Sequence, residues 1–260
     1  MKKHFKFCEV IENKQISDTL FTLKIQAPKI AHESKPGQFI NLYFNNDVKI
    51  FPRPFSISEI DSEGIFVRYK TIGSQTVKMS NWKKGDKVKV LGPLGNSFHV
   101  DLENIMSHVL VGGGIGVAPL FYLRDYIVKN GGGVHFFIGA TSRDEHFIKT
   151  DDKSDLYLAS DDGSLGFNGN VVSLMKEYID KLPQPVIIYS CGPEPMLQAL
   201  KEFGSKKDYD IQVSMEKIMG CGNGLCQGCA IRMEKHIDRK YLLACKDGPI
   251  FQAKDILIHD

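Results

Sequence analysis

Four cysteines in the last quarter of the sequence have the spacing of an iron–sulfur ligand set. Cys221, Cys226 and Cys229 are followed by Cys245, in the pattern C-x4-C-x2-C-x15-C. The first three match the plant-type ligand run of a [2Fe–2S] cluster, in which each of two irons takes two cysteine sulfurs besides the bridging sulfides. Four glycines interleave with these cysteines, and residues without a Cβ let the backbone wrap closely around an inorganic core.

A structural zinc site and a set of buried, unliganded thiols are the two alternatives for these cysteines. Zinc ribbons usually present two C-x2-C pairs, and this stretch contains one. The spacing therefore favours an iron–sulfur cluster over zinc and over inert thiols. A cluster does not perform two-electron chemistry alone, so other residues must bind the remaining redox cofactors.

Two segments in the first hundred residues could bind a flavin nucleotide. Arg53-Pro54-Phe55-Ser56 enters a strand, where a guanidinium can grip a pyrophosphate and a hydroxyl can hydrogen-bond the edge of a flavin ring. Taken alone, Arg53 is better explained as an ordinary charged residue at a strand edge. Lys70-Thr71-Ile72-Gly73-Ser74-Gln75-Thr76 offers a turn, hydroxyls and a helix start, which together can hold phosphate oxygens.

Two further segments could bind a second nucleotide. Gly112-Gly113-Gly114-Ile115-Gly116 follows an apolar strand and opens a helix, the context of a phosphate-binding loop. The G-x-G-x-x-G fingerprint fails because residue 117 is valine, although a helix N-terminus can still face a pyrophosphate. Cys191-Gly192-Pro193 ends another buried strand, on the edge where open α/β sheets bind ligands. Taken alone, Cys191 is better explained as a small buried apolar residue.

The elements that must position these residues follow two patterns. Up to about residue 100, short β-rich runs separated by turn residues such as Pro28 predict a small antiparallel barrel with one helix at Ser74–Trp82. Beyond residue 107, short apolar runs alternate with helical ones, which predicts a doubly wound parallel α/β sheet. The strands expected in the barrel are Phe5–Ile11, Leu20–Gln26, Phe39–Phe44, Phe55–Ile60, Ile65–Lys70 and Lys87–Leu91. We expect three domains, 1–102, 103–214 and 215–260, the last being a small cysteine module.

Composition excludes several classes of function. The 260 residues carry a net charge of +2, from 33 basic and 31 acidic side chains, so nucleic-acid binding has no electrostatic support. No stretch approaches the roughly 18 apolar residues that span a membrane. The basic start is followed by a polar-alternating segment and not by an apolar one, so we do not expect secretion. Six cysteines, four of them clustered, indicate metal ligands in a cytoplasmic protein.

In this order, the motifs resemble those of the ferredoxin-NADP reductase superfamily. Within it, the chain is similar to the family of iron–sulfur electron-transfer subunits of class B, NAD-dependent dihydroorotate dehydrogenases. The resemblance spans essentially the whole chain, and its most specific part is the 15-residue gap before the last cysteine. It rests on Arg53-Pro54-Phe55-Ser56, Gly73–Thr76, Gly92-Pro93-Leu94-Gly95, Gly112–Pro119, Asp161-Asp162-Gly163-Ser164, Cys191-Gly192-Pro193 and Glu216–Cys245.

The resemblance assigns each motif to a cofactor. It implies that Arg53 contacts the pyrophosphate of FAD, that Ser56 lies near flavin N5, and that Gly73, Ser74 and Thr76 hold phosphates. It implies that the glycine run at 112–116 and the run at 191–193 hold NAD, and that the four cysteines hold the cluster. Two positions depart from the family pattern. Phe55 replaces the tyrosine of the wider superfamily, although the subunit family tolerates apolar residues there, and Gln75 stands where a second glycine of a G-x-G-T turn is expected.

The function implied by the resemblance is electron transfer in pyrimidine biosynthesis. An FMN-containing catalytic subunit, in a heterotetramer with this chain, would oxidise dihydroorotate and pass electrons through the [2Fe–2S] cluster and FAD to NAD⁺. FAD is the step between a two-electron and a one-electron carrier. The strand-rich first hundred residues argue against the (β/α)8 barrel of a catalytic subunit, so dihydroorotate oxidation belongs to the partner.

Two other functions stay open. One is the NAD(P)H-dependent reductase subunit of another flavin-based or hydrogenase complex, in which Ser142-Arg143 could grip a 2′-phosphate. Asp144 and Glu145 follow directly, so a solvated loop also explains Arg143, and we favour NAD on the resemblance. The other is a non-catalytic iron–sulfur redox sensor, which the phosphate-binding motifs oppose.

Overall fold

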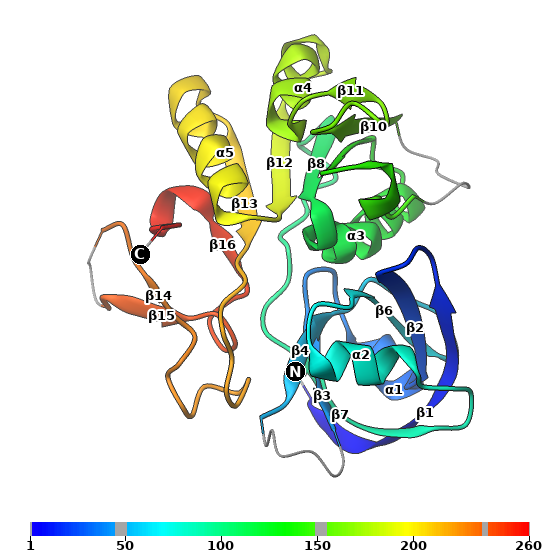
Figure 1. Cartoon of the computed structure of the whole chain (residues 1–260). Coiled ribbons are helices and arrows are strands. Elements are labelled where there is room, and N and C mark those ends of the chain that lie inside the picture. The colour runs from blue at the N-terminus through cyan, green and yellow to red at the C-terminus, as the bar shows by residue number, and fades with distance from the viewer. Residues whose placement is uncertain (1, 45–50, 149–154, 236–238, 260) are drawn as a thin grey trace.

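The computed structural model describes residues 2–44, 51–148, 155–235 and 239–259. Figure 1 shows the N-terminal sheet and the α/β sheet one above the other, with the C-terminal segment beside both. No helix of these residues is long and apolar enough to cross a membrane.

Seven antiparallel strands form the N-terminal sheet, in the order β4-β3-β7-β1-β2-β6-β5. They are β1 (His4–Gln15), β2 (Leu20–Gln26), β3 (Phe39–Tyr43), β4 (Arg53–Ser56), β5 (Glu59–Ile60), β6 (Gly64–Lys70) and β7 (Lys87–Leu94). The chain crosses from one edge strand to the other at Ile57–Ser58, where Ile57 N donates to Gln38 O at 3.0 Å and Ser58 N donates to Phe66 O at 2.8 Å. This crossing curls the sheet into the predicted antiparallel barrel.

Two local expectations for the barrel were incomplete. The single strand expected over Phe55–Ile60 is two strands, β4 and β5, because the chain turns between the sheet edges at Ile57. Pro28, which was expected to mark a turn, begins the short helix α1 (Pro28–Glu33), where a missing N–H costs nothing. The expected helix after β6 is α2 (Ser74–Ser80).

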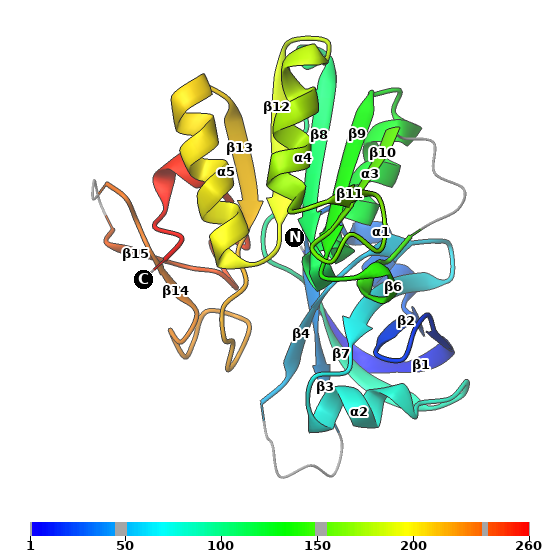
Figure 2. The ribbon, with the colours of Figure 1, turned by 45° about the horizontal axis from the view of Figure 1, so that its top comes forward.

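The second sheet has the strand order β11-β10-β9-β8-β12-β13-β16. Its strands are β8 (Ser107–Gly113), β9 (Val134–Ala140), β10 (Asp155–Ser160), β11 (Phe167–Asn168), β12 (Val186–Cys191), β13 (Asp210–Ser214) and β16 (Ile250–Gln252). Its helices are α3 (Ala118–Lys129), α4 (Val171–Tyr178) and α5 (Glu194–Lys207). Figure 2 shows α4 and α5 on one face and α3 on the other, as expected for a doubly wound sheet.

Successive side chains of the buried strands point to opposite faces of the sheet and so pack into two separate hydrophobic cores. Val109, Val111 and Ile188 pack toward α4 and α5, whereas Leu110 and Tyr189 pack toward α3. Strands buried on both faces must be apolar throughout, which explains the continuous apolar runs in the sequence.

The C-terminal segment is tied to the second sheet. β16 pairs antiparallel with β13, so the sheet is mixed at this edge and parallel elsewhere. The remaining strands of the segment, β14 (Ala230–Arg232) and β15 (Tyr241–Leu243), form a hairpin. The expected domain limits at residues 102 and 214 stay predictions.

Several side-chain contacts join the barrel to the α/β domain, among them the following three. The Tyr122 hydroxyl of α3 donates to the buried carbonyl of Ser34 at 2.9 Å. The Arg68 guanidinium of β6 lies 3.9 Å from the centroid of the Phe121 ring. Lys70 Nζ lies 2.7 Å from a carboxylate oxygen of Glu145.

We expect Tyr122→Phe to lower the free energy of unfolding by about 1–2 kcal/mol, because the buried Ser34 carbonyl loses its donor. Urea unfolding of the cofactor-loaded protein, followed by circular dichroism, measures the change. Tyr126→Phe makes the same deletion on an exposed residue of α3 and should leave the midpoint unchanged. Identical midpoints for all three proteins would show that the contact contributes nothing.

Candidate cofactor sites

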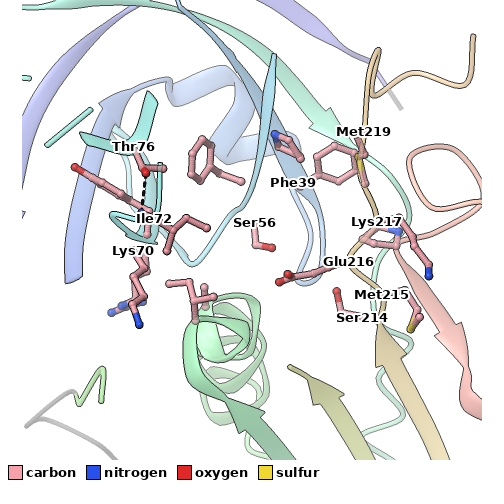
Figure 3. Close-up of a pocket in the computed structure, with 17 residues that line it drawn as sticks. Phe39, Ser56, Lys70, Ile72, Thr76, Ser214, Met215, Glu216, Lys217 and Met219 are labelled. Carbon is pink, nitrogen blue, oxygen red and sulfur yellow. Dashed lines mark hydrogen bonds between the residues drawn. The ribbon is translucent and has the colours of Figure 1, made fainter. Parts of the chain in front are cut away.

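A cavity of about 260 Å³ lies where the barrel, α3 and the segment after β13 meet. The barrel contributes Phe39, Pro54, Phe55, Ser56, Arg68, Tyr69, Lys70, Ile72 and Thr76. The rest of the wall is Ile115, Ala118, Ser214, Met215, Glu216, Lys217, Met219 and Pro249. Figure 3 shows labelled side chains from both domains around one space.

The cavity brings together five of the predicted flavin-binding residues. They are Pro54, Phe55, Ser56, Lys70 and Thr76. Gly73, Ser74 and Gln75 lie at the start of α2 beside this wall but do not line it. Arg53 does not line it either, and its Nη1 lies 3.3 Å from the carbonyl oxygens of Phe51 and Pro52. The predicted pyrophosphate contact of Arg53 therefore stays untested.

The turn before α2 is organised by Thr76. Its hydroxyl oxygen accepts hydrogen bonds from Ile72 N at 3.0 Å and Gly73 N at 3.2 Å, and the hydroxyl donates to Gly73 O at 3.0 Å. A Cβ built on Gly73 would meet nothing within 4 Å, so the turn opens onto free space. Gln75 is buried, and neither polar atom of its amide has a partner among the described residues.

These features fit a flavin nucleotide. Phe55 and Tyr69 form an apolar wall, with ring centroids 6.3 Å apart in an edge-to-face arrangement, that suits a planar ring. Tyr69 donates to Asn13 Oδ1 at 3.0 Å, and burial raises the pKa of Tyr69 to about 12. Its hydroxyl is therefore a neutral part of the wall at physiological pH. The orphaned amide of Gln75 leaves polar capacity beside the phosphate turn.

A second hollow, of about 330 Å³, lies between the two glycine-containing loops. Gly113, Gly114, Gly116, Gly192 and Pro193 line it. A Cβ on Gly116 would lie 2.5 Å from the Cα of Gly192, so the two loops touch backbone to backbone. Only glycine allows this approach.

The remaining two residues predicted for this second site, Gly112 and Cys191, do not line the hollow but precede the loops at the ends of β8 and β12. A Cβ on Gly112 would meet Val117 at 2.9 Å, so Gly112 lets the chain fold back into the 3-10 turn Gly114–Val117 before α3. Cys191 is fully buried at the end of β12, and burial raises its thiol pKa well above the usual range. The side chain of Cys191 is therefore a neutral packing group.

The four predicted cluster cysteines form two pairs. The thiol of Cys221 lies beside that of Cys226, and Cys229 lies beside Cys245. The second pair is buried, whereas Cys226 is exposed. Two thiolates for each of two irons is the arrangement a [2Fe–2S] cluster needs. In the described ranges, no group of three or more histidine, cysteine, aspartate or glutamate side chains is placed to hold a single metal ion.

Backbone donors already point at the cysteine sulfurs. Burial acts to raise the pKa of Cys221, but the N–H groups of Asn223 and Cys226, at 3.5 and 3.4 Å, together with the Cys226 thiol and the Leu225 N–H, outweigh it and lower the pKa to about 6. Burial and the adjacent Cys229 thiol raise the pKa of Cys245 to about 12. Such N–H donors favour thiolates and tune the potential of a cluster.

The barrel holds the first cysteine in place. Asn41 of β3 donates from Nδ2 to the carbonyl of Cys221 at 3.2 Å. The neighbouring Gly222 has a φ of +70°, and a Cβ there would lie 2.1 Å from the same nitrogen, so only glycine fits. The cysteine loop is thus fixed against the strand whose Phe39 lines the flavin cavity.

Sequence reasoning missed several cavity residues. Arg68 and Tyr69 are adjacent residues of β6 and belong to no recognisable motif. Glu216 was noted only as the start of the cysteine segment, although it follows the last parallel strand at the edge of the sheet where ligands bind. Arg143 begins the 3-10 turn Arg143–Glu145 that follows β9, and its guanidinium donates to Ser164 O at 3.1 and 3.3 Å.

Comparison with known proteins matches the two ends of the chain to two families. Residues 7–99 match the oxidoreductase FAD-binding domain. Residues 216–257 match the iron-sulfur cluster binding domain of dihydroorotate dehydrogenase B. These ranges contain the flavin-cavity residues of the barrel and all four cysteines.

Full-length relatives and solved structures agree with this match. A Fusobacterium nucleatum protein named as the electron transfer subunit of dihydroorotate dehydrogenase B (NAD(+)) is 36% identical, covering 96% of this chain and 98% of its own. The Bacillus velezensis protein of the same name is 34% identical, covering 96% and 97%. The structure of the NADH-dependent reduced ferredoxin-NADP oxidoreductase has a TM-score of 0.84 at 26% identity, covering 96% of this chain and 89% of that one. Human Ncb5or, at 15% identity over 82% of this chain and 70% of that chain, has a TM-score of 0.68 and shares the fold.

The fold, the paired cysteines and the flavin cavity therefore belong to a chain whose sequence is similar to these subunits over nearly its whole length. The chain belongs to the family of dihydroorotate dehydrogenase B electron transfer subunits.

Proposed function

We propose that this chain transfers electrons from a dihydroorotate-oxidising catalytic subunit to NAD⁺, in pyrimidine biosynthesis. One observation carries the proposal. The flavin cavity is lined on one side by Ile115 of the glycine run and on the other by Met219, two residues before Cys221. The nicotinamide site, the flavin site and the cluster thus follow one another in the order that electron transfer requires.

The chain's residues divide the binding tasks. Phe55, Ser56 and Tyr69 hold the flavin ring, while Ser74 and Thr76 present the phosphate turn. The two glycine loops hold NAD, and the four cysteines hold the [2Fe–2S] cluster. FAD supplies the exchange between paired and single electrons, and no side chain needs to form a covalent bond. Binding on two separate domains brings the nicotinamide and flavin rings together.

The partner is an FMN-containing catalytic subunit, in a heterotetramer with two copies of each chain. Supporting this, exposed apolar side chains flank the cysteine loop: Ile218 is 91% and Leu225 is 79% accessible. Exposed apolar groups beside a redox centre are typical of a docking face. The composition of the chain, with four of six cysteines given to the cluster, favours a cytoplasmic location.

A second candidate is the reductase subunit of a complex that uses NADP(H). The TM-score of 0.84 with the ferredoxin-NADP oxidoreductase structure favours it, since the same fold and coverage serve that enzyme. Arg143, in the turn after β9, is the residue that a 2′-phosphate would recruit, but its guanidinium is bound to the carbonyl of Ser164. Michaelis constants for NADH and NADPH distinguish the two.

The first test is the visible spectrum of anaerobically purified protein before and after NADH. We expect flavin bands with a broad iron–sulfur shoulder, both bleached by NADH. Cys226→Ala should remove the shoulder while NADH still bleaches the flavin, because the hydride enters from the other side of the cavity. Cys8→Ala, a buried cysteine of the barrel core, is the matched control and should keep both chromophores. A cluster without flavin, and without a response to NADH, would support the redox sensor instead.

Gly116→Ala should weaken NADH binding at least tenfold, about 1.4 kcal/mol, because its Cβ would force the two glycine loops apart. Flavin and cluster absorbance should stay at the wild-type level. Fluorescence titration with NADH measures the dissociation constant. Gly133→Ala is the control. Gly133 directly precedes β9, at the end of the strands opposite the glycine loops, and its Cβ would meet only Met106 O at 3.2 Å. Unchanged affinity in Gly116→Ala would place the nicotinamide site elsewhere.

Leu225→Glu should weaken association with the catalytic subunit at least tenfold, because it puts a charge into the apolar rim of the cysteine loop. Its spectrum and NADH response should stay intact. Surface plasmon resonance with the catalytic subunit measures the affinity. Met106→Glu is the control, because it introduces the same negative charge at an exposed apolar position before β8. Equal affinities for both variants would move the docking face away from the cluster.

A further inference from the structure

The proposed function requires a proton as well as electrons, and the present inference rests on that function. A hydride carries two electrons and one proton, whereas a [2Fe–2S] cluster passes electrons alone. For every hydride given to NAD⁺, one proton must therefore enter at the flavin. In the reverse direction the same proton must leave, and a side chain in the cavity that binds and releases a proton would serve both directions.

Glu216 occupies the place where such a group is required. It lines both the flavin cavity and the hollow between the glycine loops, and it is the acidic residue common to the two. It lies two residues beyond β13 and five residues before Cys221. In Figure 3 the side chains of Glu216 and Ser56 both point into the cavity, one from each domain.

No described residue holds Glu216 as an anion. Its carboxyl group has no hydrogen-bond or ion-pair partner in the parts of the chain that the structure describes. Lys217 next to it is paired with Glu194 at 3.0 Å, and Lys70 is paired with Glu145. Arg68, the remaining cation of the wall, faces Glu59 at 3.5 Å. Each nearby positive charge therefore already has a carboxylate of its own.

The surroundings of Glu216 favour its protonated form. The side chain of Glu216 is exposed to the open cavity, but the protein around the carboxyl group reduces its contact with water and raises its pKa above the ordinary value. Cys191, which lies behind it, is also neutral, since burial and Glu216 both raise the pKa of its thiol. A carboxyl group with a raised pKa can hold a proton near neutral pH and release it when charge develops beside it.

The other hydroxyl and acidic groups nearby are less suited to carry a proton. Thr76 is committed to the phosphate turn through three hydrogen bonds. Tyr69 donates to Asn13, and its pKa of about 12 keeps its proton in place. Glu194 lines only the second hollow and is ion-paired with Lys217.

We propose that Glu216 is the proton-transfer residue of the flavin site. When two electrons arrive through the cluster, the O–H bond of the Glu216 carboxyl group breaks and an N–H bond forms at flavin N5. The carboxylate then regains a proton from solvent through the cavity. In the opposite direction, N5–H gives its proton to the carboxylate as the two electrons leave singly through the cluster. The transfer of hydride between NAD and the flavin needs no proton from Glu216.

Reduction of the flavin by NADH and reduction of the flavin through the cluster can be measured separately. Glu216→Gln tests the proposal, because glutamine has the shape of glutamate but no acidic proton. Stopped-flow reduction of the flavin by NADH should stay within about twofold of wild type. Reduction of the flavin by photochemically reduced methyl viologen, a one-electron donor to the cluster, should slow by roughly 100-fold. In Glu216→Gln, the rate of this viologen-driven reduction should no longer depend on pH and should show no solvent isotope effect in D2O. Glu216→Asp should restore the pH dependence and the solvent isotope effect, with a reduction rate below that of wild type.

A second readout does not depend on rates. The infrared difference spectrum on photoreduction should show the C=O band of a protonated carboxyl group in wild type, and Glu216→Gln should lack it. Glu103→Gln, at an exposed carboxyl outside both hollows, is the control and should behave as wild type in every measurement. All variants must carry wild-type amounts of FAD and cluster by absorbance.

Two results would overturn the inference. If Glu216→Gln slows both half-reactions equally, Glu216 positions a nucleotide and does not carry the proton. If neither slows and the carboxyl band persists, another group supplies the proton. Failure of NADH to reduce the flavin in wild type is a different outcome, because it refutes the proposed function itself.

Discussion

The short backbone segment between β13 and Cys221 determines how the cofactor sites lie relative to one another. Met215 N donates to Pro249 O at 2.9 Å, so this segment is held against the chain that leads into β16. The next residues line the flavin cavity, and the cysteine loop begins directly after Met219. Because fewer than ten residues join the last parallel strand to the first cysteine, the cluster cannot lie far from the flavin. Pairing of β16 with β13 and the Asn41 hydrogen bond to Cys221 fix the direction of that segment.

The cavity depends on the contact between the two domains, and the contributions to this contact differ in kind. The Tyr122–Ser34 hydrogen bond is buried, and the Arg68 guanidinium packs on the buried ring of Phe121 with only 9% of its side chain exposed, so water competes little for either contact. The Lys70–Glu145 ion pair is about one-quarter to one-third exposed, and a pair of that exposure contributes little net stability. Loss of the Lys70–Glu145 pair would therefore leave the domain arrangement in place.

The sequence contained enough to predict the fold, because local patterns specify its main elements. Continuous apolar runs on β8, β9 and β12 indicated strands buried on both faces, and cysteine spacing indicated the cluster without any tertiary information. β16 was not found because three residues carry too little periodicity, and its pairing with β13 is a long-range contact. Glu216 was not found as a cavity residue for a related reason. Its importance comes from where two domains meet, and nothing in its neighbouring sequence encodes that meeting.

The difference in burial between the two cysteine pairs gives the cluster an inner and an outer side. Cys229 and Cys245 pack in the same core as Phe39 and Met215, and both of those residues line the flavin cavity. Cys226 is exposed, and Leu225 beside it is an accessible apolar residue. An iron bound by the inner pair would be shielded by the same side chains that line the cavity, whereas an iron bound by the outer pair would lie nearer the exposed side of the loop. Burial alone thus gives the cluster module a direction, from a partner's surface toward the cavity, before any potential is considered.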